Sequence, residues 1–115
     1  MIIRRKFRYL LVEASRDLEI NDKKAQASLA DGLAGVMGYL EYSEASPRVM
    51  AQVSRKAFII RCARGQESRL LLALAFVKEL DGRGTGLCTI RTSGSIRRLV
   101  DSARLLYGIP GSRQN

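Results

Sequence analysis

The sequence predicts an α+β fold of the split βαβ type, in which a four-stranded antiparallel sheet carries two helices on one face. Apolar residues recur with periods that alternate between strand and helix in the order strand, helix, strand, strand, helix, strand. An additional amphipathic segment follows the fourth strand. The length of 115 residues suits one core. We therefore expect one domain over residues 1–107 and a flexible tail over residues 108–115.

The strands are predicted from period-two patterns bounded by turn residues. We expect them at residues 6–14, 48–53, 56–63 and 87–92. The first strand has no uniformly polar face, which indicates a central strand covered on both sides. Pro47 opens the second strand, and a short turn at Ser54 and Arg55 joins it to the third. In this fold the first strand lies between the third and the fourth.

The helices are predicted from apolar residues three and four positions apart. We expect them at residues 22–37, 66–80 and 96–107. Asn21 or Asp22 caps the first helix, Gly38 ends it, and Ser95 caps the last. The middle helix is apolar on most faces and should be largely buried. The last helix should cover part of the open sheet face with an inner stripe of Ile96, Leu99, Val100, Ala103 and Leu106.

Histidine is absent and only two cysteines occur, Cys62 and Cys88. This excludes histidine-dependent acid–base catalysis and the usual zinc sites. Both cysteines lie in apolar strand patterns, where a buried, unreactive thiol is expected. The predicted sheet places them two strand spacings apart, ~9–10 Å, which exceeds the roughly 7 Å between Cα atoms that a disulfide allows. No cofactor is expected in the protein itself.

The net charge of +9 is concentrated in the second half of the chain. Residues 55–115 hold 12 basic and 4 acidic side chains, and 10 of the basic ones are arginines. The guanidinium group grips phosphate oxygens in pairs and stacks on bases. RNA or DNA is therefore the first expected partner, ahead of an acidic membrane surface or an acidic protein. No apolar run is long enough for a membrane span and no signal peptide is recognised, so a cytoplasmic protein is expected.

Basic residues stand where several elements of the predicted fold begin or end. They occur at the end of the third strand, at the end of the fourth strand, in the first turn of the last helix, and in a basic arm with interleaved aromatics at the start of the chain. The candidate RNA-binding residues are Arg4, Arg5, Lys6, Arg8, Arg61, Arg64, Arg91, Ser93, Ser95, Arg97 and Arg98.

The strand at residues 56–61 is similar to the central strand of an RNA-recognition motif. It departs from that pattern at Ala57, where glycine is usual, and at Ile60, where a second stacking aromatic is usual. Phe58 is therefore predicted to lie in the core. Tyr39, Leu40 and Tyr42 form an apolar stretch that either contacts a protein partner or begins the second strand.

Residues 4–107 resemble the archaeal ribonuclease P protein component 2 family. The resemblance is carried by Arg8-Tyr9-Leu10 with Glu13, Ile60-Arg61-Cys62, Leu72-Ala73-Leu74-Ala75, Leu80-Asp81-Gly82 and Ser93-Gly94-Ser95-Ile96-Arg97-Arg98-Leu99. It implies a ferredoxin-like, RNA-recognition-motif-like sandwich. It also implies a subunit of the ribonucleoprotein that removes the 5′ leader of precursor tRNA.

The same resemblance implies that the catalytic centre belongs to the ribonuclease P RNA and its Mg²⁺ ions, and that the protein has no catalytic residues. It further implies a heterotetramer with ribonuclease P protein component 3, containing two copies of each. Two other readings stay open. One is a small acyl-phosphate hydrolase on the same fold, although residues 15–19 are acidic where such an enzyme needs a Gly-rich phosphate loop. The other is a ligand-binding regulatory module that pairs sheet to sheet.

Overall fold

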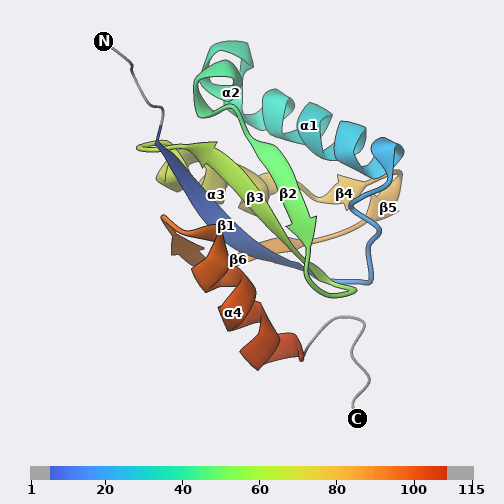
Figure 1. Ribbon diagram of the computed structural model, residues 1–115. Coiled ribbons are helices and arrows are strands. Elements are labelled where there is room, and N and C mark those ends of the chain that lie inside the picture. Colours follow the sequence, from blue (N-terminus) through green and yellow to red (C-terminus); the bar gives the residue numbers. More distant parts are fainter. Residues whose placement is uncertain (1–5, 109–115) are drawn as a thin grey trace.

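A computed structural model describes residues 6–108 of the chain and shows one four-stranded antiparallel sheet in the order β2-β3-β1-β6 (Figure 1). The strands are β1 (Phe7–Ala14), β2 (Arg48–Gln52), β3 (Ala57–Ala63) and β6 (Leu87–Ser93). This is the predicted fold class, with the first strand between the third and the fourth. The predicted tail from residue 109 on, and Arg4 and Arg5, lie outside the described residues.

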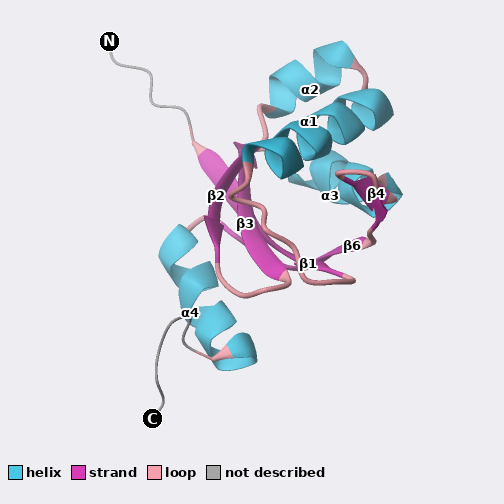
Figure 2. Cartoon of the chain, turned by 90° about the vertical axis from the view of Figure 1, so that its right-hand side faces the viewer, coloured by secondary structure: helices cyan, strands magenta, loops and turns pink. Residues whose placement is uncertain are grey.

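Helices cover both faces of the sheet (Figure 2). They are α1 (Lys23–Met37), α2 (Tyr39–Ala45), α3 (Glu67–Phe76) and α4 (Ile96–Tyr107). The first three form a layer on one face, and α4 lies across part of the other face, as the sequence predicted. The molecule therefore has three layers, with the four-stranded sheet in the middle.

Strand β1 is buried on both sides because each face of the sheet packs against helices. Leu10 and Val12 belong to the core under α1 and α3, whereas Leu11 belongs to the core under α4. All three side chains have no exposed surface. The same alternation in β3 sends Phe58 to the α1–α3 core and Ile59 to the α4 core, which confirms the core position predicted for Phe58.

The predicted caps fix the helix ends. Asp22 is the N-cap of α1, and its Oδ1 accepts from the Lys24 N–H at 3.4 Å. Gly38 follows α1 at φ +85°, a conformation that glycine tolerates without strain. Ser95 Oγ accepts from the Arg98 N–H at 3.4 Å and caps α4.

The middle helix is shorter than predicted, since α3 ends at Phe76. Residues 77–80 instead lead into a small antiparallel ribbon, β4 (Glu79–Leu80) with β5 (Arg83–Gly84). The prediction was wrong because Val77 and Leu80 are buried apolar residues at a helix-like spacing. Their burial arises from an extended segment that lies against α1, with the Val77 side chain beside Gly32.

The stretch that begins at Tyr39 is a helix, α2, and the alternative that it starts the second strand was wrong. Gly38 separates α2 from α1 and redirects the chain. Tyr42 packs against the core and Ala45 is fully buried, whereas Tyr39 and Leu40 are exposed.

Several residues predicted to be buried are exposed. Leu71, Leu72 and Phe76 lie on the outer side of α3, where no other element within residues 6–108 covers them, so the largely buried middle helix was a wrong prediction. Leu106 is likewise exposed, and Tyr107 packs on the α4 core. Cys62 is buried as predicted, but Cys88 is exposed on edge strand β6; both are free thiols.

Candidate nucleic-acid interface

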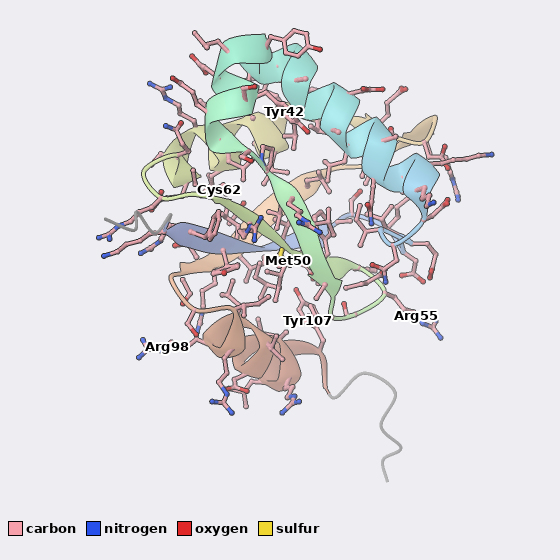
Figure 3. The ribbon with its side chains drawn as sticks, turned by 45° about the horizontal axis from the view of Figure 1, so that its top comes forward. Tyr42, Met50, Arg55, Cys62, Arg98 and Tyr107 are labelled. Carbon is pink, nitrogen blue, oxygen red and sulfur yellow. The ribbon has the colours of Figure 1, made fainter. Side chains whose placement is uncertain are left out.

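Cationic side chains gather at the end of the sheet where β1 begins and β3 and β6 end. Antiparallel pairing brings these termini together, and the starts of β2 and α4 lie beside them. We call this region the basic end and define it by Lys6, Arg8, Arg48, Arg61, Arg64, Arg97 and Arg98. Figure 3 shows Arg98 on this side of the molecule and Arg55 on the opposite side. Charges that are far apart in the sequence thus share one flank.

Arg61 lies on the sheet face that α4 partly covers. Its guanidinium carbon sits 4.0 Å from the centroid of the Phe7 ring, and this stacking restrains the side chain. The buried Nε of Arg61 has no hydrogen-bond partner among residues 6–108. Arg48 pairs directly with Arg61 across the β2–β3 ladder. Arg48 was missed from the sequence, although counting the hairpin register back from Ser54 and Arg55 would have placed it.

Arg8 points to the other face of the sheet, towards the start of α3. Its Nε lies 3.2 Å from Glu67 Oε2, and the other oxygen of that carboxylate accepts from the Gly65 N–H at 2.6 Å. Gly65 sits at φ +94° in the turn between β3 and α3. One acidic side chain therefore holds both a basic-end arginine and the neighbouring turn. Glu67 was not predicted as part of the site.

A hollow of about 390 Å³ opens at the start of β1. It is lined by Lys6, Phe7, Arg8, Tyr9, Arg64 and Gly94. Pairing of β1 with β6 ends at Tyr9 and Ser93, so within the described residues the first part of β1 has no partner strand on that side. The backbone N–H of Arg64 donates to the Lys6 carbonyl at 3.0 Å. This hydrogen bond holds the two basic residues side by side where β1 begins and β3 ends.

The turn from β6 into α4 presents the next basic group. Ser93 Oγ accepts from the Ser95 N–H at 3.0 Å, so both predicted serines shape the turn and the cap. Arg97 and Arg98 follow in the first helical turn and are exposed. Positive charge there opposes the helix dipole, and a bound anion would relieve that repulsion.

The remaining predicted residue, Arg91, is placed apart from this group. Its Nη1 donates to Ser102 Oγ of α4 at 3.1 Å, which ties β6 to the helix that crosses it. Within residues 6–108, ion pairs engage only Arg8 and Arg69, the latter with Glu44 at 3.9 Å. The other cations of the basic end therefore have no carboxylate partner in the described part of the chain.

Arg16, in the segment after β1, has a structural role that bears on the hydrolase alternative. Its guanidinium donates to Thr85 Oγ1 at 2.7 Å, to the Leu80 carbonyl at 3.0 Å and to the Gly84 carbonyl at 3.3 Å, and these contacts hold the β4–β5 ribbon. The arginine is thus occupied by protein acceptors, and the phosphate loop required of an acyl-phosphate hydrolase is not supported. The regulatory-module alternative is not favoured either, because α4 lies on the sheet face that sheet-to-sheet pairing would use.

Other chemistry finds little support in the described residues. No group of three His, Cys, Asp or Glu side chains within residues 6–108 is placed to hold a metal ion. Burial raises the pKa of the Cys62 thiol to about 11, and the nearby Glu67 carboxylate adds to the shift, so this thiol stays protonated at neutral pH. None of the helices in this part of the chain has the length and apolarity of a membrane span.

Several large apolar side chains of the helical layer are exposed. Large apolar side chains face solvent on α1, α2 and α3: Val36, Tyr39, Leu40, Leu71, Leu72 and Phe76. We call this set the apolar helical surface. Tyr39 is 87% exposed and Leu40 is 74% exposed, which is unusual for large apolar residues and is typical of contact sites for other proteins.

Comparison with known proteins gives concordant results. The sequence model of the Rpp14/Pop5 family matches residues 8–104. "Ribonuclease P protein component 2" of Methanocorpusculum labreanum is 30% identical over 97 residues, which are 84% of this chain and 65% of that protein. The chain thus spans just under two thirds of that relative's length.

The fold also resembles a chain in the cryo-EM structure of yeast ribonuclease MRP, with a TM-score of 0.52 and 20% sequence identity. The alignment covers 92% of this chain and 88% of the yeast chain. At this level of identity the likeness shows a shared fold, and it agrees with the α+β sandwich described above.

Proposed function

Because the chain belongs to the Rpp14/Pop5 family, as the sequence indicated, we propose that it is an RNA-binding protein subunit of ribonuclease P. In this proposal the basic end holds phosphates of the ribonuclease P RNA and thereby supports removal of the 5′ leader from precursor tRNA. The main support for this proposal is that seven cationic side chains lie at the basic end. Within residues 6–108, only one of the seven, Arg8, is in an ion pair.

The division of labour follows from the chemistry of the side chains present. Arginine and lysine neutralise phosphates but supply neither a general base near neutral pH nor a metal site. As the family resemblance implies, the proposal assigns the reaction to the RNA, whose Mg²⁺ ions would supply the Lewis-acid chemistry. The protein lowers the repulsion between phosphates that the folded RNA brings together, so that the RNA folds at a lower Mg²⁺ concentration than it would alone.

The test measures binding of ribonuclease P RNA between 50 and 200 mM salt. The double variant R97A/R98A should bind more weakly, and the slope of log K against log salt should flatten by about 0.7–0.9 for each lost phosphate contact. The control, R83A/R104A, removes the same charge from exposed arginines at other places in the fold. An unchanged slope in R97A/R98A, or an equal change in both variants, would contradict the proposed interface.

The protein partner is proposed to be ribonuclease P protein component 3, in a heterotetramer with two copies of each chain. The apolar helical surface supports this proposal, since it lies on the layer opposite α4 and is free of the basic residues assigned to RNA.

A matched pair of leucines tests the partner surface. L72D places a charge on the apolar helical surface, whereas L105D places one on α4, where Leu105 is 89% exposed. Co-purification with component 3 should fail for L72D and persist for L105D. Loss of co-purification with L105D alone would move the contact to α4.

A further inference from the structure

We propose that the hollow at the start of β1 is a binding site for one phosphate group of an RNA backbone, with Arg8 and Arg64 as its principal donors and Glu67 as the residue that positions Arg8. The proposal rests on the function proposed above and specifies one site within the basic end.

The lining of the hollow is selective for an anion. Lys6, Arg8 and Arg64 contribute three positive charges, and no carboxylate among residues 6–108 lines the space, although Glu67 is paired with Arg8 beside it. By contrast, a hollow of about 840 Å³ at the other end of the sheet includes Glu13, Asp17 and Glu19, whose three carboxylates outnumber the two cations of its lining, Arg55 and Lys56. Its carboxylates would repel a phosphate, so size alone does not identify the site.

The dimensions suit a phosphate within a chain. A water molecule takes roughly 30 Å³ of liquid volume, so about 390 Å³ accommodates a phosphate with part of its ribose. The space exists because β6 stops pairing at Ser93 and turns away through Gly94. An incoming backbone meets Arg8 without obstruction by a side chain at position 94: Arg8 Nη1 lies 3.8 Å from the point that a Cβ there would occupy.

Glu67 holds the Arg8 guanidinium by charge. Glu67 Oε2 lies 3.2 Å from Arg8 Nε, which makes no hydrogen bond within residues 6–108, and Nη1 of the same guanidinium lies beside Gly94 at the hollow. The second carboxylate oxygen of Glu67 accepts a hydrogen bond from the Gly65 N–H, so the Glu67 side chain is itself restrained. A guanidinium restrained along one edge loses less conformational entropy when its other edge binds phosphate.

This arrangement predicts that Glu67 strengthens RNA binding, although its negative charge alone would weaken it. Removing a carboxylate from a basic surface should strengthen RNA binding if only long-range electrostatics mattered. If Glu67 positions Arg8, then E67Q should weaken binding of ribonuclease P RNA, about threefold to tenfold. The control is E44Q, which removes a carboxylate from an exposed ion pair on α2 and should leave affinity unchanged or slightly increased.

The decisive measurement is a double-mutant cycle between positions 8 and 67. R8A should bind the RNA about tenfold more weakly and lower the salt slope by about 0.7–0.9. In the R8A background, E67Q should cause no further loss, because Glu67 acts through Arg8. R64A, an exposed position beyond β3, should also lower the slope and tests the hollow without altering the ion pair. Thermal unfolding confirms that each variant is folded.

The outcomes separate this site from the general proposal. If wild-type protein does not bind the RNA, the proposed function fails. If it binds and R97A/R98A lowers the slope, but R8A and R64A do not, the hollow is not a phosphate site. If R8A and R64A lower the slope while E67Q strengthens binding, the site stands and the positioning role of Glu67 is overturned.

Discussion

The hydroxyl of Tyr107 donates a hydrogen bond to Glu13 Oε2 at 3.1 Å and joins the last turn of α4 to the end of β1. The contact links residues that are 94 positions apart and closes the helix over the sheet face that the split βαβ arrangement leaves open. Burial, together with the Glu13 contact, raises the pKa of Tyr107 to about 12. α4 is therefore anchored at its C-terminal end by a polar contact.

The hydrogen bond between Tyr107 and Glu13 should make the stability of the fold depend on pH in the alkaline range. The native state retains the Tyr107 proton up to about pH 12, whereas the unfolded chain releases it near the ordinary tyrosine pKa of 10.0. The contribution to stability is complete below pH 10 and is lost as pH rises from 10 to 12.

Y107F should lower the free energy of unfolding by about 1 kcal/mol below pH 10, and the difference from wild type should shrink above it. Urea unfolding at several pH values measures this. Y39F, at an exposed tyrosine, is the control, and a constant difference from pH 8 to 12 would count against the anchor.

The apolar contact of α4 with the sheet should matter more. Leu99 has no exposed surface and packs in the core with Leu11 and Ile59. L99A should therefore cost about 2–5 kcal/mol. L105A, on the exposed side of the same helix, should change stability by less than about 0.5 kcal/mol. Denaturant unfolding of both variants tests whether α4 is packed in the isolated chain, since equal small effects would mean that it is not.

The sequence was a good guide to elements whose pattern has one physical explanation. Strand β1 lacks a polar face because it is covered on both sides, and Asp22, Gly38 and Ser95 end helices through local backbone chemistry. The order of elements then determined the strand order.

The sequence was a poor guide where an apolar residue has two explanations. Leu72 and Phe76 look like core residues, but they face solvent on α3, and Leu80 extends a helical pattern although it belongs to the β4–β5 ribbon. The pairing of Arg8 with Glu67 depends on how α3 packs beside β1. Such contacts leave no local signature, so the hollow could not be predicted.

The two thiols should differ sharply in reactivity. Cys62 is fully buried with a pKa raised to about 11, whereas Cys88 is exposed on β6. A thiol reagent at pH 8 should modify one cysteine in the native protein and two after unfolding. C88S should abolish the native reaction and C62S should not, and rapid modification of Cys62 in folded protein would contradict its burial.

Arg16 should prove to be structural, in contrast to the arginines of the basic end. Its guanidinium supports the β4–β5 ribbon through Leu80 and Thr85, and the buried Thr85 hydroxyl accepts from Arg16 while it donates to the Arg83 carbonyl at 3.0 Å. R16A should cost about 2 kcal/mol and should speed amide exchange at the Thr85 N–H, which donates to the Lys78 carbonyl. R83A, which removes an exposed arginine of the same ribbon, is the matched control and should do neither. The salt slope for RNA binding should be unchanged in R16A, because each nitrogen of the Arg16 guanidinium already donates to a protein acceptor. A lowered slope in this variant would extend the RNA interface to the opposite end of the sheet.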